Sequence, residues 1–138
     1  MRLTDLTGAL RVQRILGTAD KDVKALKYRS DKCEPGDAFF ALRGRDADGH
    51  DFIADAAARG AQVIFVEDAA ACASDIKNNP DLTIVEVPDT RQALALTAAA
   101  FYRYPARELL TVGITGTKGK TTTAFLLQAI FEAAGMQT

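Results

Sequence analysis

Short runs of consecutive apolar residues alternate along this chain with stretches that have the composition of helices. Residues 61–67 (AQVIFVE) and 82–87 (LTIVEV) are rich in β-branched residues and too short for helices, so they predict strands that are covered on both faces. Residues 38–42 (AFFAL) follow a turn signal at Pro35-Gly36 and predict a third strand. A helical stretch follows each run, and this strand–helix order predicts an α/β fold with helices packed on a sheet.

Two of the expected helices have clear start and stop residues. Asp51 can cap a helix that runs to about Arg59, where Gly60 supplies a left-handed stop. Asp89 can cap a longer helix, which Pro105 ends because proline cannot continue a helix. A short N-terminal helix is also predicted, from three leucines at helical spacing: Leu3, Leu6 and Leu10.

Composition limits the classes of function. The 138 residues are 48% hydrophobic and 25% charged with a net charge of −1, so no global field draws the chain onto nucleic acid or an anionic membrane. The apolar runs are shorter than the roughly 20 residues that a membrane-spanning helix needs. The N-terminus has no secretion signal. We therefore expect a cytoplasmic protein with no nucleic-acid or membrane partner, in which Cys33 and Cys72 are reduced thiols.

Residues 113–123 (GITGTKGKTTT) form the most informative motif of the chain. They lie between residues 111–115, which predict a strand, and an apolar stretch from about Thr121 to Ala134, which predicts a helix that Gly135 ends. A strand that turns through glycines into a helix aims several backbone N–H groups at one point. The helix dipole adds positive potential there, so this turn favours a phosphate.

The residue types in this loop suit a nucleotide. Gly116 and Gly119 let the backbone approach closely and adopt positive φ. Lys120 can reach the β- and γ-phosphates, and the hydroxyl of Thr121 can bind a Mg²⁺ ion that bridges them. The string is shorter than the standard phosphate loop, which has a glycine where Ile114 stands. The alternative is a glycine-rich helix start with an exposed lysine, which leaves three threonines in the first helical turn unexplained.

Two motifs together resemble the Mur ligase family of peptidoglycan synthesis. The string TGTKGKTTT is similar to the family's ATP loop, typically TGTNGKTTT, with Lys118 in place of the asparagine. Residues 29–67 (RSDKCEPGDAFFALRGRDADGHDFIADAAARGAQVIFVE) resemble the family's N-terminal substrate domain, whose pattern runs roughly D-S-R-x-V-x-P-G-D-x-F-x-A-L-x-G-x-x-x-D-G-H-x-F-I. The two blocks stand in family order with the expected separation, which is more specific than either block alone.

The resemblance implies an ATP-dependent ligase that forms an amide bond. ATP would phosphorylate the D-glutamate carboxylate of the substrate to an acyl phosphate, and the amine of an amino acid would then displace the phosphate. Lys120 and Thr121 would be catalytic, with Thr121 also on Mg²⁺. The implied ATP-binding residues are Gly116, Thr117, Lys118, Gly119, Lys120, Thr121 and Thr122.

Within the family, the E-type ligase is the most similar. It adds the third peptide residue, diaminopimelate or lysine, to UDP-N-acetylmuramoyl-L-alanyl-D-glutamate; the F-type ligase, which adds D-alanyl-D-alanine, is the nearest competitor. Arg29 and Asp31 stand in reverse order to the family's Asp-Ser-Arg motif. The implied contacts with the uridine diphosphate part of the substrate are Tyr28, Ser30, Arg45, Asp46 and Ala47, although Ser30 as a turn hydroxyl and Arg45 as a solvated charge remain alternatives.

The resemblance also implies how the chain is divided. Residues 1–106 are expected to form the UDP-substrate-binding N-terminal domain, and residues 107–138 to begin the central ATP-binding domain. The amino acid would bind a third domain outside this chain, so the 138 residues alone are expected to be inactive. Residues 109–138 are expected to dock on the first domain, pair with another copy or be disordered. A non-catalytic UDP-sugar- or nucleotide-binding module and a small phosphate-loop kinase remain alternatives.

Overall fold

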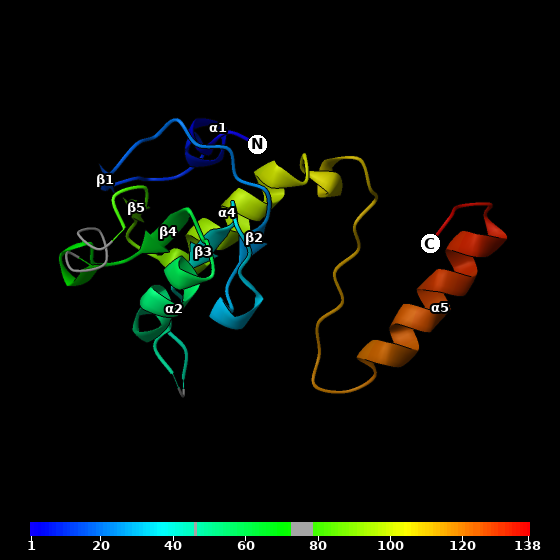
Figure 1. Cartoon of the computed structure of the whole chain (residues 1–138). Helices are drawn as coiled ribbons and strands as arrows, with labels where there is room; N and C mark the ends of the chain where they lie inside the picture. Colours follow the sequence, from blue (N-terminus) through cyan, green and yellow to red (C-terminus); the bar gives the residue numbers. More distant parts are fainter. Residues whose placement is uncertain (46, 73–78) are drawn as a thin grey trace. The chain divides into compact units, whose positions relative to one another are not determined.

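The computed structural model describes residues 1–45, 47–72 and 79–138. It divides into two compact units, Met1–Pro105 and Ala106–Thr138. In the first unit the described residues form a five-stranded mixed sheet in the order β1-β5-β4-β3-β2 (Figure 1). Strands β2 to β5 are parallel to their neighbours and β1 is antiparallel to β5. The strands are β1 (Arg14–Leu16), β2 (Leu26–Lys27), β3 (Ala38–Phe40), β4 (Val63–Val66) and β5 (Thr83–Glu86).

The predicted α/β fold is confirmed, because helices cover both faces of this sheet. On one face, Phe39 and Ile64 pack with Ile53 of α2 (Ile53–Ala58). On the other face, Phe40 and Phe65 stack with ring centroids 4.3 Å apart, in a cluster that includes residues of α1 (Leu3–Thr7) and α4 (Thr90–Phe101). Successive side chains of a strand point to opposite faces, so the continuous apolar runs feed both clusters.

The helix boundaries confirm some capping predictions and correct others. The Asp89 side chain accepts a hydrogen bond from Gln92 N at 2.9 Å, as an N-cap of α4 should. Asp51 does not cap the predicted helix; Asp48 instead caps a 3₁₀ turn, Gly49–Phe52, that leads into α2. The reason is local. The Asp48 carboxylate accepts a hydrogen bond from the backbone N–H of His50, and this bond starts the 3₁₀ turn three residues ahead of Asp51.

The end of α4 also differs from expectation, while the helical stretch expected before β5 falls largely on residues 73–78, outside the described residues. Helix α4 ends at Phe101, because Arg103 and Tyr104 adopt positive φ angles of 60° and 55° ahead of Pro105. Short 3₁₀ turns occur at three further places: Ser30–Lys32, Ala70–Cys72 and Pro105–Arg107. No described helix is long and apolar enough to cross a membrane.

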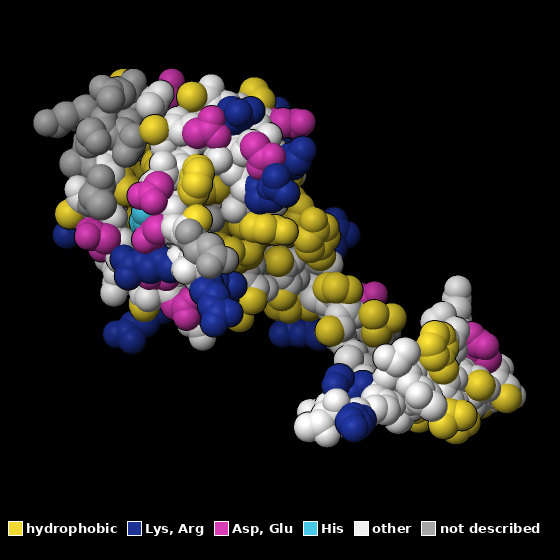
Figure 2. Space-filling view, turned by 90° about the horizontal axis from the view of Figure 1, so that it is seen from below, with side chains coloured by type: hydrophobic (Ala, Val, Ile, Leu, Met, Phe, Trp, Pro, Cys, Tyr) yellow, Lys and Arg dark blue, Asp and Glu magenta, His cyan; other side chains and the backbone are white. Residues whose placement is uncertain are grey.

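The second unit consists of an extended segment followed by α5 (Lys120–Ala133). The helix confirms the prediction, and Gly135 follows it with a φ angle of 77°. The predicted strand at 111–115 is wrong: these residues pair with no strand among the described parts of the chain, and a strand exists only through its neighbours. Hydrophobic side chains are exposed over this unit (Figure 2).

Candidate ligand-binding cavity and phosphate loop

The first unit contains a cavity of about 430 Å³ at the carboxyl ends of β2 and β3. The segment that follows β2, the loop that follows β3 and the first turn of α4 all contribute to it. In open α/β sheets the crevice outside the carboxyl ends of the strands is where ligands bind. The cavity is lined by Tyr28, Arg29, Ser30, Asp31, Phe39, Leu42, Gly44, Ala47, Gly49, Phe52 and Arg91.

The structure brings together three of the five residues predicted to contact the uridine nucleotide. Tyr28, Ser30 and Ala47 line the cavity although they come from two separate segments. Arg45 lies in the same loop as Ala47 but is not among the described lining residues. Asp46 lies outside the residues that the structure describes.

Ser30 is held in place from below the cavity. Its side chain is only 9% exposed, and its hydroxyl hydrogen-bonds the Asp55 carboxylate of α2. That hydrogen bond, together with one from Arg59, lowers the pKa of Asp55. The oxygen of the Ser30 hydroxyl can accept a hydrogen bond from a ligand.

The residues on either side of Ser30 form an ion pair at the cavity wall. The Arg29 guanidinium makes two hydrogen bonds to the Asp31 carboxylate, Nε to Oδ1 at 3.0 Å and Nη2 to Oδ2 at 2.8 Å. The pair raises the pKa of Arg29 and lowers that of Asp31. Arg29 and Asp31 stand in the opposite order to the family's Asp-Ser-Arg motif, and in this order they form an ion pair on either side of Ser30.

The loop after β3 doubles back tightly to form one wall. Gly49 N donates to Leu42 O at 2.8 Å, and Gly44 N donates to Ala47 O at 2.9 Å. A β-carbon on Gly49 would lie 2.5 Å from the Leu42 backbone nitrogen, so the close approach of the two segments requires glycine at that position. Asp48 and Gly49 therefore have a structural role in this turn, which is the role that their residue types predict.

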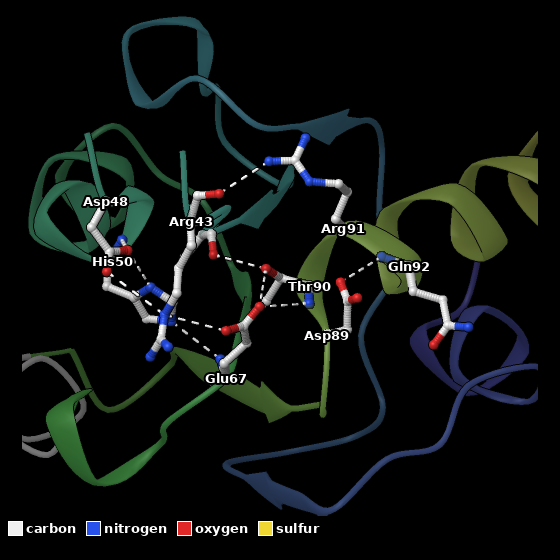
Figure 3. A network of polar contacts seen from close by, with 9 residues as sticks. Arg43, Asp48, His50, Glu67, Asp89, Thr90, Arg91 and Gln92 are labelled. Carbon is white, nitrogen blue, oxygen red and sulfur yellow. Dashed lines mark hydrogen bonds and ion pairs between the residues drawn. The ribbon is translucent and has the colours of Figure 1, made fainter. Parts of the chain in front are cut away.

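A polar network behind this loop joins it to the end of β4 (Figure 3). Glu67 N donates to His50 Nε2 at 3.1 Å, so the other ring nitrogen carries the hydrogen and donates to Asp48 Oδ1 at 2.6 Å. The backbone and side chain of His50 together lower the pKa of Asp48. Arg43 Nε lies 3.2 Å from Glu67 Oε2 and 3.7 Å from Asp48 Oδ2. His50 is a structural connector of the loop.

The same network ties down the first turn of α4. Thr90 N donates to Glu67 Oε1 at 3.2 Å, and the Thr90 hydroxyl lies 3.0 Å from Ala41 O and 3.1 Å from Glu67 Oε1. The next residue, Arg91, donates from Nη2 to Arg43 O at 3.0 Å (Figure 3). The first turn of α4 is therefore fixed to the residues that directly follow β3 and β4, beside the cavity.

Sequence reasoning missed several lining residues. The sequence motifs assign no site role to Phe52, but this residue is 44% exposed and lines the cavity. Arg91 was overlooked because it lies far from the motif at 29–49 in the sequence. The sequence did contain a signal for Arg91. This residue lies in the first turn of the helix that follows β5, and in a parallel sheet such a turn lies near the carboxyl ends of the neighbouring strands.

The second unit carries the predicted phosphate loop at the start of α5. Gly116 and Gly119 adopt φ angles of 154° and 77°, and a β-carbon on Gly119 would meet nothing within 4 Å. Lys120 Nζ donates to Gly116 O at 2.5 Å, so the amine folds back over the loop. The predicted residues Gly116, Thr117, Lys118 and Gly119 form the loop, and Lys120, Thr121 and Thr122 form the first turn of the helix.

The first turn of α5 has backbone donors to offer. The helix ladder begins with Thr123 N donating to Gly119 O at 2.9 Å, and no side chain caps the helix start. The N–H groups of the preceding helical residues have no intrahelical acceptor and can serve an anion. Within the described residues no cluster of three His, Cys, Asp or Glu side chains could hold a metal ion. The exposed Thr121 hydroxyl fits Mg²⁺ that arrives with nucleotide phosphates and waters.

Several ligases are similar to this chain in sequence. The UDP-N-acetylmuramoyl-L-alanyl-D-glutamate--2,6-diaminopimelate ligase of Clostridium perfringens is 39% identical over 138 residues, which cover 100% of this chain and 27% of that protein. The UDP-N-acetylmuramyl-tripeptide synthetase of Deinococcus radiodurans is 40% identical over 140 residues, which cover 100% of this chain and 28% of that protein. The chain thus spans little more than a quarter of the length of these relatives.

Solved structures give the same relationship. A UDP-N-acetylmuramoylalanyl-D-glutamyl-2,6-diaminopimelate--D-alanyl-D-alanyl ligase from Acinetobacter baumannii matches with a TM-score of 0.66 and 31% identity, over 96% of this chain and 28% of that one. The MurF ligase of Thermotoga maritima in complex with ADP matches with a TM-score of 0.56 and 28% identity, over 80% of this chain and 24% of that one. Residues 22–102, well over half of the sequence, match the family model described as the Mur ligase family, catalytic domain. The chain belongs to the Mur ligase family.

Proposed function

We propose that this chain carries the substrate-binding domain and phosphate loop of the ATP-dependent ligase that adds the third peptide residue to UDP-N-acetylmuramoyl-L-alanyl-D-glutamate. Relatives named for this reaction match the whole chain at 39% identity. The observation that carries the proposal is the cavity at the carboxyl ends of β2 and β3. Tyr28, Ser30 and Ala47, which the sequence motifs single out as substrate contacts, line it together.

The cavity suits a nucleoside in size and chemistry. Its volume of about 430 Å³ lies within the range of small-molecule sites. Tyr28 is 63% exposed and Phe52 44% exposed, so both offer apolar ring surface to a planar base. The Ser30 hydroxyl offers a polar group to the remainder of the nucleotide. We assign substrate binding to residues 1–106, with Arg45 and Asp46 as further contacts from the same loop.

The phosphate loop would serve the ATP half of the reaction. ATP transfers its γ-phosphoryl group to the D-glutamate carboxylate, which gives ADP and an acyl phosphate, and an amino group then displaces inorganic phosphate to form the amide. Lys120 would hold the β- and γ-phosphates, and the Thr121 hydroxyl would hold Mg²⁺, which would supply positive charge to the phosphates. The Lys120 amine donates to Gly116 O, a contact that a phosphate would replace. We assign residues 107–138 to the start of the ATP-binding domain.

The relatives support one type of ligase and one added amino acid. Sequence relatives at 39% identity are named as diaminopimelate ligases, and we therefore propose diaminopimelate as the added residue. The structural neighbours are D-alanyl-D-alanine-adding ligases at 31% identity, which keeps the F-type enzyme as the second candidate. The higher sequence identity favours the E-type.

We propose that the 138 residues bind the UDP substrate but do not catalyse the reaction. Residues 111–115 pair with no strand in the described parts of the chain, so the phosphate loop lacks the sheet that would fix its backbone donors. We expect weak binding of Mg-ATP and no ADP formation. ADP or acyl-phosphate formation by the purified 138 residues would contradict this.

Calorimetric titration with UDP-N-acetylmuramoyl-L-alanyl-D-glutamate tests the proposed function. We expect saturable binding that Phe52→Ala weakens, because the variant removes ring surface from the cavity. Tyr102→Ala is the matched control, since Tyr102 is an exposed aromatic residue of the first unit that does not line the cavity. The proposal fails if the wild-type chain does not bind, or if both variants weaken binding equally.

A further inference from the structure

The arginines that line the cavity differ in whether a carboxylate neutralises their charge. Two arginines, Arg29 and Arg91, line it. Arg29 is neutralised by its two hydrogen bonds to Asp31. Arg91 donates to a backbone carbonyl, Arg43 O, and no carboxylate of the described residues lies within ion-pair distance of it. Arg91 therefore brings a positive charge to the cavity wall that no described acidic side chain offsets.

Nearby Arg43 does not share this property. It lies behind the loop and forms ion pairs there, with its Nε 3.2 Å from Glu67 Oε2 and 3.7 Å from Asp48 Oδ2. Figure 3 shows Arg43 turned toward Glu67 and His50, whereas Arg91 reaches the loop from the start of α4. The network thus separates a structural arginine from one that faces the cavity.

The position of Arg91 is fixed by the elements on which it stands. Its neighbour Thr90 is tied to Ala41 and Glu67, and Asp89 caps the same helical turn. One guanidinium nitrogen is held on Arg43 O at 3.0 Å. A guanidinium has five N–H donors in a planar fork, so several remain for a second acceptor, and a held guanidinium loses less rotamer freedom when an anion binds.

We propose that Arg91 is the anion-contacting side chain of this cavity and binds the diphosphate of the nucleotide. This inference rests on the proposed function, because it takes a nucleoside diphosphate as the ligand. Tyr28 and Phe52 supply ring surface for the base, and Arg91 supplies the cation that two phosphates need. The pairing of apolar rings with a guanidinium that no described carboxylate offsets selects a charged nucleotide over its uncharged nucleoside.

Titration of the 138-residue chain with UDP and, separately, with uridine tests this assignment. We expect Arg91→Gln to lower the affinity for UDP by roughly tenfold or more, the size of losing a hydrogen bond to a charged group. The affinity for uridine should not change. Arg91→Lys should retain part of the UDP affinity, because it keeps the charge but loses the fork. The salt dependence of UDP binding should be smaller in Arg91→Gln than in the wild type.

Arg14→Gln is the matched control, since Arg14 is an exposed arginine of edge strand β1. It should bind both ligands like the wild type, and thermal unfolding of each variant shows that the fold is retained. If the wild type binds both ligands and Arg91→Gln changes UDP and uridine affinity equally, or changes neither, the role of Arg91 is wrong while the proposed function stands. If the wild type binds neither ligand, the proposed function fails and this inference fails with it.

Discussion

Gly49 lies where the backbone of the neighbouring segment leaves no room for a side chain. A β-carbon there would lie 2.5 Å from Leu42 N and 2.7 Å from Leu42 O. Backbone atoms cannot move aside cheaply, so Gly49→Ala should lower the free energy of unfolding by roughly 1–3 kcal/mol. Urea denaturation measures this. In Gly8→Ala the nearest atom would be Thr4 O at 3.6 Å, so that variant should be neutral, and equal effects of the two substitutions would contradict the account.

Cys33 makes stability depend on pH at the alkaline end. Burial raises the pKa of its thiol to about 11 from an ordinary value of 9.0. The folded state therefore favours the protonated thiol, and the unfolded chain releases the proton first as the pH rises. The stabilisation is complete below pH 9 and is lost between about pH 9 and pH 11. Urea denaturation across this range should show a smaller decline for Cys33→Ala than for the wild type; identical slopes would contradict the assignment.

At the level of single residues, the site could be predicted only in part. Tyr28, Ser30 and Ala47 stand in one stretch of sequence with a recognisable order, and they do line one cavity. Arg91 joins that cavity from a segment more than forty positions away, and only the parallel sheet makes them neighbours. Phe52 is a large aromatic residue of the kind that fills cores, and no local signal shows that it stays exposed at the end of the 3₁₀ turn Gly49–Phe52.

At the level of elements, prediction succeeded where many residues carry one signal. The continuous apolar runs of β3, β4 and β5 and the capped helix α4 were predictable for this reason. Strands β1 and β2 have three and two residues, too few to show a period. The strand expected at 111–115 failed for a different reason: its residues have the right propensity, but they pair with no strand in the described parts of the chain.

The cap of α4 is the element-scale feature that most directly supports the cavity. Asp89 accepts from Gln92 N at 2.9 Å, and the turn that it fixes carries Thr90 and Arg91. Asp89→Ala should lower the free energy of unfolding by about 1 kcal/mol. Asp89→Asn keeps an acceptor at the same place and should retain most of that stability. The cap has no such role if urea denaturation gives the same value for both variants.

At the scale of the whole molecule, the two units differ in how much of their apolar side-chain surface is buried. The core clusters of the first unit bury the large side chains of its sheet. In the second unit Leu109, Leu110, Phe125, Leu126 and Ile130 are all at least 60% exposed. Exposed large apolar side chains in this number favour association.

We therefore expect the 138-residue chain to self-associate through residues 109–138. Sedimentation equilibrium should show a concentration-dependent dimer, and residues 1–106 alone should stay monomeric. Leu126→Glu should reduce association because it places a charge on the exposed apolar face, whereas Gln137→Glu, which adds the same charge at an exposed polar position, should not. A chain that is monomeric at all concentrations, or two variants that behave alike, would rule out this surface.

The central claim is that the cavity beside β2 and β3 holds the uridine nucleotide part of a peptidoglycan precursor. An NMR titration of the ¹⁵N-labelled chain with UDP-N-acetylmuramoyl-L-alanyl-D-glutamate tests it most directly. The account predicts saturable shifts of backbone amides at the cavity, led by those of Tyr28, Ser30, Ala47 and Gly49, that UDP alone reproduces in large part. Absence of shifts, or shifts confined to residues away from this cavity, would contradict it.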